Sequence, residues 1–156
     1  MDRLRLSRFV DQHLSNLPLE EPVAVTPNDP VSRALELMRE GSRSCVVTVD
    51  EGRLTGIFTE RDLLTRCMGE GFDWSQPVRA VCTASPRTVA ATATVGEAIA
   101  ILQQHSYRTL PVVDGDRVTG LVRTGDLLRH LAEEFPEDVL NLPPRPHQVM
   151  EKQEGG

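Results

Sequence analysis

The sequence predicts an α+β fold in which two β-α-β-β-α repeats pack against each other with pseudo-twofold symmetry. The first observation behind this prediction is an internal repeat with an offset of 64 residues. The stretch VTVDEGRLTGIFTERDLL (47–64) aligns without a gap with PVVDGDRVTGLVRTGDLL (111–128). A fixed internal period indicates the architecture before any single residue is considered.

The second observation is an apolar stripe that recurs upstream of this match with the same offset. Its members follow the spacing i, i+3, i+4, i+7, which is typical of an amphipathic helix with one face in the core. The Asp29-Pro30 pair or Ser32 can start the first of these helices, and Gly41 can end it. The paired positions are Val31, Ala34, Leu35 and Met38 in the first copy and Val95, Ala98, Ile99 and Leu102 in the second.

The third observation is a predicted β-hairpin in each copy. The apolar runs CVVTV and TLPVV are followed by the turns DEGR and DGDR and then by the strands LTGIF and VTGLV. Each hairpin leads into a second helix, at about 60–68 and about 125–134, and short strands are expected at 23–26 and 87–90. One repeat is too small to bury its sheet alone, so we expect the two sheets to pack together and to leave clefts where ligands bind.

The chain therefore divides into four predicted parts. These are an N-terminal helical extension at 1–16, repeat 1 at 17–75, repeat 2 at 76–134 and a proline-rich C-terminal tail at 135–156. The extension is amphipathic and can pack on the module or on a second subunit through Leu4, Leu6, Phe9, Val10 and Leu14. The tail carries Pro136, Pro143, Pro144 and Pro146, so we expect it to run extended over its own fold or onto a partner.

Composition excludes several classes of partner. The formal net charge is −6 and basic residues do not cluster, which argues against nucleic acid as the main partner. Apolar runs fall short of the roughly 18 residues of a membrane span, and the charged N-terminal stretch lacks the apolar core of a secretory signal, so we expect a cytoplasmic protein. Cys45, Cys67 and Cys82 are widely spaced, which favours reduced core thiols over disulfides or a metal site.

The stretch GIFTERDLL (56–64) joins the second strand of the first hairpin to a helix. Thr59 and Asp62 are three residues apart at this junction, which is the spacing of a capping box. In a capping box the two side chains satisfy backbone N–H groups of the helix itself. The motif alone therefore leaves open whether these residues cap the helix or hold a ligand.

The paired repeats, the LPVVD-turn-G hairpin and GIFTERDLL together closely resemble a tandem pair of cystathionine-β-synthase-type (CBS) domains, over roughly residues 17–134. The resemblance implies a Bateman-type regulatory module whose clefts bind adenosyl compounds: AMP, ADP, ATP, S-adenosylmethionine or, in some members, NAD. The ligand would be regulatory, and no cofactor or metal would be required.

The resemblance implies one complete ligand site and one altered site. In the first, a phosphate would lie at the helix N-terminus against the Thr59 hydroxyl, Asp62 would accept both ribose hydroxyls, and Arg61 or an arginine of the facing repeat would offset the negative charge. The base would lie against Ile57, Thr83 and Tyr107, although Tyr107 is equally compatible with a place at the core edge. The second copy has Arg123 in place of the threonine and Thr124 one position later, so its site, with Asp126, Leu121 and Arg43, is doubtful.

These expectations combine into a predicted homodimeric, non-catalytic sensor that passes its binding state to an unidentified regulated protein. Enzyme motifs are absent and the four histidines are scattered, although a Cys–His pair formed by folding, with Cys67 as its nucleophile, would give an enzyme. The other alternative is a ligand-free dimeric adaptor that presents a surface to another protein.

Overall fold

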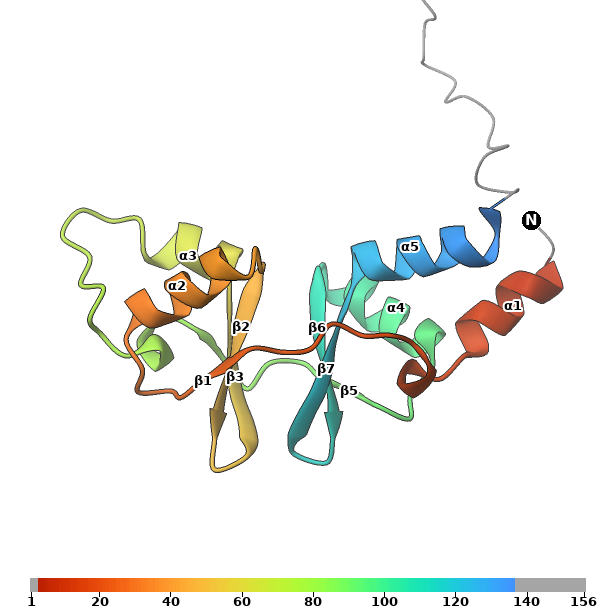
Figure 1. Ribbon diagram of the computed structural model, residues 1–156, viewed down its shortest axis with the longest axis horizontal. Helices are drawn as coiled ribbons and strands as arrows, with labels where there is room; N and C mark the ends of the chain where they lie inside the picture. Colours follow the sequence, from red (N-terminus) through yellow and green to blue (C-terminus); the bar gives the residue numbers. More distant parts are fainter. Residues whose placement is uncertain (1–2, 137–156) are drawn as a thin grey trace, which may run out of the picture.

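A computed structural model describes residues 3–136, and the predicted proline-rich tail lies almost entirely outside this range. The two predicted repeats are present, and their hairpins stand side by side at the centre of the molecule (Figure 1). Helices flank each hairpin on the outside. The predicted α+β architecture of two β-α-β-β-α repeats is confirmed.

Repeat 1 contains β1 (Ala24–Val25), α2 (Val31–Glu40), β2 (Cys45–Asp50), β3 (Arg53–Thr59) and α3 (Glu60–Arg66). Repeat 2 contains β5 (Val89–Ala90), α4 (Val95–His105), β6 (Thr109–Asp114), β7 (Arg117–Arg123) and α5 (Thr124–Glu134). In the first hairpin turn, Glu51 and Gly52 both have positive φ, as a tight hairpin turn requires. Gly41 is the C-cap of α2, as the sequence predicts.

Sequence periodicity misses three short elements. These are the 3-10 helices η1 (Leu14–Asn16) and η2 (Val78–Ala80) and the strand β4 (Thr83–Ala84). β4 lies in the segment that leads into β5 of repeat 2, yet it pairs antiparallel with β3 of repeat 1. In the same way Glu20, in the segment that leads into β1 of repeat 1, forms an antiparallel bridge with Leu121 of β7. Each sheet thus receives its outer segment from the stretch that leads into the other repeat.

Each repeat has its own apolar core, and a third cluster joins them. Cys45, Val47, Ile57 and Leu121 are buried together where β2 and β3 meet β7. The two hairpins also share a backbone hydrogen bond from Leu54 N to Asp116 O at 3.0 Å. This seam between the sheets is the packing that the repeat pattern predicts.

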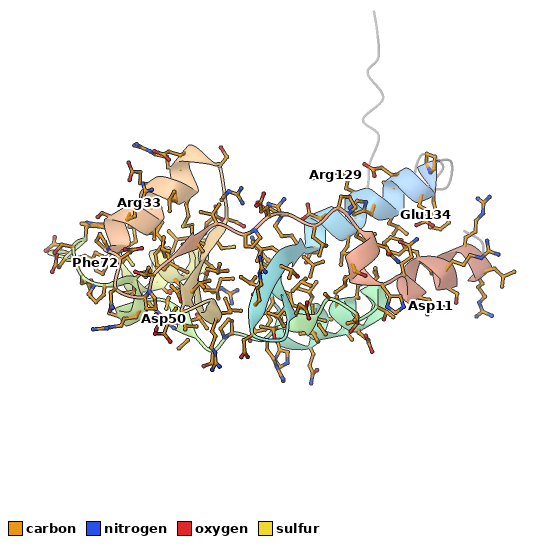
Figure 2. The ribbon with its side chains drawn as sticks, turned by 60° about the horizontal axis from the view of Figure 1, so that its bottom comes forward. Asp11, Arg33, Asp50, Phe72, Arg129 and Glu134 are labelled. Atoms are coloured by element: carbon orange, nitrogen blue, oxygen red, sulfur yellow. The ribbon has the colours of Figure 1, made fainter. Side chains whose placement is uncertain are left out.

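The N-terminal extension packs on repeat 2. Helix α1 (Arg3–Asp11) places the buried Phe9 in the core of repeat 2, where Leu14 is also buried. The chain then crosses to repeat 1, as Figures 1 and 2 both show. No helix within residues 3–136 combines the length and the apolar character that a membrane crossing needs.

Candidate functional site

The junction between β3 and α3 forms the capping box that its sequence allows. The Asp62 amide donates to Thr59 Oγ1 at 3.2 Å, and the Thr59 amide donates to Asp62 Oδ2 at 3.0 Å. Two N–H groups that a helix start leaves unpaired are thereby satisfied. The Asp62 carboxylate is therefore turned back onto its own main chain.

A contact from the segment that leads into repeat 2 reaches the same carboxylate. Thr83 Oγ1, from β4, donates to Asp62 Oδ1 at 3.1 Å, while Thr59 Oγ1 donates to Oδ2 at 3.1 Å. Asp62 is only 5% exposed, so these donors replace the water that an ionised carboxylate needs. Because a carboxylate has about four acceptor positions, Oδ1 still has room for a further donor.

Arg66 is the arginine that lies beside Asp62. Its Nε is 3.8 Å from Asp62 Oδ1, and its Nη1 donates to the carbonyl oxygens of Val81 and Cys82 at 3.1 and 2.8 Å. Arg66 thus ties the last turn of α3 to the segment that leads into β4. The sequence analysis named Arg61, or an arginine of the facing repeat, for this role, and Arg61 is exposed in the first turn of α3. The i+4 spacing from Asp62 is the signal that points to Arg66.

The three predicted base-binding residues fall in two places. Ile57 is buried at the seam and lies directly opposite Thr83 in the β3–β4 pair. The Tyr107 ring instead stacks on His105, with the ring centroids 5.3 Å apart and the planes at 19°. Tyr107 lines a cavity of about 350 Å³ in repeat 2, whose lining includes Thr124 and Leu128 but not Asp62.

The second junction is organised by an ion pair. Arg123 occupies the N-cap position of α5, and no side-chain hydrogen bond caps that helix. Its Nε and Nη2 donate to Asp126 Oδ2 and Oδ1 at 2.9 and 3.1 Å, a bidentate geometry suited to a carboxylate. The hydrogen bond to Asp126 raises the pKa of Arg123. Arg129 lies 3.6 Å from the same carboxylate, so two cations already neutralise Asp126.

Glu20 joins the remaining residues predicted for this second site. Its Oε2 lies 3.0 Å from Arg123 Nε, and its Oε1 lies 3.3 Å from Arg43 Nη1. The Leu121 amide donates to the Glu20 carbonyl at 2.9 Å. The structure therefore brings Arg43, Leu121, Arg123 and Asp126 together through a residue that the offset of 64 does not identify.

The cysteines have the environment of core residues. Cys45, Cys67 and Cys82 are free and buried. Burial raises the pKa of the Cys67 thiol, and the nearby Asp62 carboxylate raises it further. An activated nucleophile needs the opposite shift, towards the thiolate, so the environment of Cys67 does not favour the enzyme alternative.

The fold and these junctions define a class of protein, an α+β module of two paired repeats. In this module the strand-to-helix turn of each repeat contacts the segment that leads into the first strand of the other repeat. A family model described as "CBS domain" matches residues 14–69 and 78–133. The chain belongs to the CBS domain family and carries a tandem pair of these domains. The boundaries predicted from the sequence at 17, 75 and 134 stay predictions.

Curated relatives and solved structures agree with this membership. CBS domain-containing protein YhcV of Bacillus subtilis is 31% identical over 103 residues, which are 66% of this chain and 74% of YhcV. Hypoxic response protein 1 of Mycobacterium tuberculosis is 28% identical over 70% of this chain and 78% of its own length. The CBS-domain containing protein ATU1752 from Agrobacterium tumefaciens has a TM-score of 0.65 and 26% identity over 72% of this chain and 90% of its own.

One solved structure of the same fold is a complex with a nucleotide. The likeness to the crystal structure of CBSX2 in complex with AMP has a TM-score of 0.67 and covers 78% of this chain and 97% of CBSX2. Its sequence identity to this chain is 21%, so the likeness extends to the fold alone.

Proposed function

We propose that this protein is a non-catalytic regulatory module that binds an adenosyl nucleotide at the seam between its two CBS domains. The observation that carries this proposal is the inter-repeat contact at Asp62. A buried carboxylate of repeat 1 accepts a hydrogen bond from Thr83, which belongs to the segment entering repeat 2. The AMP bound to CBSX2, a protein of the same fold, supports the choice of ligand class.

In the proposed complex the ribose hydroxyls bind Asp62. Oδ1 is the oxygen with free acceptor capacity, and the Thr83 hydroxyl can turn away to admit a ribose hydroxyl. The Thr59 hydroxyl faces the phosphate, and Arg66 balances the charge that the ligand adds beside Asp62. Ile57 offers an apolar surface next to Thr83, where the base would lie. Arg61 and Tyr107 stay candidate contacts from the sequence.

Signalling would follow from the position of the ligand. A molecule that contacts Asp62 in repeat 1 and Thr83 at the entry to repeat 2 favours one relative arrangement of the two repeats. The shift is limited to the difference in the ligand's affinity between the arrangements. A regulated partner protein would read that arrangement, and a homodimer would present it twice.

Thermal unfolding with AMP, ATP, S-adenosylmethionine and NAD tests the proposal. A ligand at 100 times its dissociation constant adds about 2.7 kcal/mol, which raises the midpoint by roughly 5 to 10 °C at this chain length. Asp62→Ala should abolish this ligand-dependent rise, and Asp126→Ala is the matched control that should keep it. Because each alanine lowers the starting midpoint, the rise is measured against the same variant without ligand.

The second candidate is a ligand-free adaptor, and a specific observation favours it. Thr59 and Asp62 already satisfy each other in the capping box, which is complete without a ligand. If none of these nucleotides raises the midpoint and titration calorimetry detects no heat of binding, the result favours the adaptor function over the sensor. A rise that is equal in the wild type and in Asp62→Ala would place the nucleotide elsewhere and contradict the proposed site.

A further inference from the structure

Strand pairing makes Glu20 the structural counterpart of Thr83. Ile57 and Leu121 are 64 residues apart and hold the same place in their repeats. Thr83 lies opposite Ile57, and Glu20 lies opposite Leu121. The spacing between Glu20 and Thr83 is 63, so the register of the entry segment shifts by one residue relative to the sequence offset.

The two junctions therefore differ by two matched replacements. In repeat 1, Thr59 and Thr83 both donate hydroxyls to Asp62. In repeat 2, Arg123 replaces the first threonine and binds Asp126 bidentately, and Glu20 replaces the second and binds Arg123. An arginine alone would leave a surplus positive charge at the seam, and the glutamate compensates it.

The resulting chain of charges spans the two repeats. It runs from Arg43 at the start of repeat 1's hairpin through Glu20 to Arg123 and Asp126 in repeat 2, with N–O distances of 3.3, 3.0 and 2.9 Å. The Glu20 side chain is 20% exposed and those of Arg43 and Arg123 are 25% and 32% exposed. The group is therefore shielded in part, with a fraction of each side chain open to solvent.

We propose that the Glu20 carboxylate is a built-in occupant of the second site, which holds the Arg43–Arg123 pair in place of an external phosphate and so excludes anionic ligands. Two guanidinium groups that face one anion are a phosphate-binding arrangement, and a carboxylate satisfies the same geometry. The ligand class that this pair would take, once Glu20 is absent, is an anion with several phosphate oxygens. Nucleotide binding, if the proposed function is correct, is then restricted to the Asp62 site.

The backbone around Glu20 allows this exclusion to be tested without dismantling the fold. Its carbonyl accepts from Leu121 N, and Arg43 also donates to the Glu21 carbonyl at 2.7 Å. These contacts do not involve the Glu20 carboxylate. Glu20→Gln keeps the size and the backbone contacts of the residue while it removes the charge that competes with phosphate.

Titration calorimetry with inorganic pyrophosphate at low salt is the deciding experiment, because salt screens such contacts. Glu20→Gln should bind pyrophosphate at least about tenfold more tightly than the wild type, the effect of one or two charged hydrogen bonds. Glu21→Gln, which removes the same charge one residue away, should behave as the wild type. Adding Arg43→Gln to Glu20→Gln should return the affinity to the wild-type level.

Equal pyrophosphate affinity in the wild type and in Glu20→Gln, with folding verified by circular dichroism, would overturn the inference. So would an equal gain in Glu21→Gln, because the effect would then be one of net charge. Neither result bears on the Asp62 site, since that site is the same in the wild type and in both variants. Conversely, a wild type that binds no nucleotide refutes the proposed function. The pyrophosphate comparison would still decide whether Glu20 excludes anions from the second site.

Discussion

Thr83 Oγ1 donates a hydrogen bond to Asp62 Oδ1 over 3.1 Å, and this contact links the entry segment of repeat 2 to helix α3 of repeat 1. The acceptor is a buried carboxylate, for which each lost donor is costly. Loss of the contact should therefore lower the stability of the protein and also change the environment of the Asp62 carboxylate in the candidate site.

Thr83→Val should destabilise the protein by about 1 kcal/mol, because valine keeps the shape and β-propensity of threonine but leaves Asp62 Oδ1 without its best donor. Urea unfolding at neutral pH measures the difference. Thr119→Val is the matched control, since its hydroxyl makes only a 3.4 Å bond to the Val112 carbonyl. A loss as large in Thr119→Val as in Thr83→Val would contradict this role of the Thr83 hydroxyl.

Gly56 and Gly120 are equivalent in sequence but differ in their surroundings. A Cβ added at Gly56 would lie 2.7 Å from Thr48 Oγ1, 2.9 Å from Cys82 Sγ and 3.0 Å from the Thr83 carbonyl oxygen. The nearest atoms at Gly120 belong to the Leu19 side chain, at 3.0 and 3.1 Å. The Thr83 backbone, which is paired with β3, yields less easily than the partly exposed side chain of Leu19.

Gly56→Ala should therefore cost about 1–3 kcal/mol, the range for overpacking, and Gly120→Ala should cost clearly less. Chemical denaturation of both variants gives the comparison. Gly125→Ala serves as the control, because nothing lies within 4 Å of its added Cβ and alanine favours the helix by about 0.5 kcal/mol or more. The reverse order for Gly56 and Gly120 would show that the tight approach at β4 is not a constraint.

The repeat architecture could be predicted because the periodicity of helices and strands is a local property of the sequence, and it occurs in both copies of the repeat. The stripe that begins at Val31 and the hairpin around Gly56 needed only the sequence offset of 64. Strand β4 could not be found this way, because its partner lies in the other repeat and a two-residue strand has no periodicity. The motif alone allows Thr59 and Asp62 either to cap the helix or to hold a ligand, and the structure shows that the capping box forms.

The candidate sites were predictable in part for the same reason. Residues on the β3–α3 and β7–α5 turns came from the motif, but Glu20 depends on a one-residue shift of register that no sequence pattern encodes. Its counterpart Thr83 was found from the family pattern. Arg66 lies on a predicted helix at i+4 from Asp62, so helical spacing alone would have placed it correctly.

The Cys45 thiol should make stability depend on pH in the alkaline range. Burial, and next the nearby Glu20 carboxylate, raise its pKa from 9.0 to about 11. Below pH 9 the thiol is protonated in the folded and unfolded states, so its contribution is complete. Between pH 9 and 11 the unfolded chain loses the proton first, and stability falls by about 2 kcal/mol.

Urea unfolding of the wild type and of Cys45→Ala at pH 8, 9, 10 and 11 measures this contribution. The wild type should lose stability more steeply than Cys45→Ala above pH 9, because all other titrating groups are shared and cancel in the difference. Parallel pH profiles of the two proteins would contradict the raised pKa.

The predicted homodimer can be tested on helices α3 and α5, which lie along the same side of the molecule (Figure 1). Leu64 and Leu128 are equivalent residues of the two repeats and are 66% and 62% exposed. Met68, which follows α3, is 57% exposed, and Leu128 also lines the cavity that contains Tyr107. Apolar surface that recurs with the pseudo-twofold symmetry fits a second copy of the chain.

The double variant Leu64→Glu/Leu128→Glu should shift the protein from dimer to monomer in sedimentation equilibrium, because each copy then brings like charges to the interface. Both positions are mostly exposed within one chain, so circular dichroism should show an unchanged fold. Gln104→Glu adds one negative charge at an exposed position of α4 and should leave the dimer intact. If the wild type sediments as a monomer, or if the double variant still dimerises, this face is not the dimer interface, and any communication between copies must use another surface.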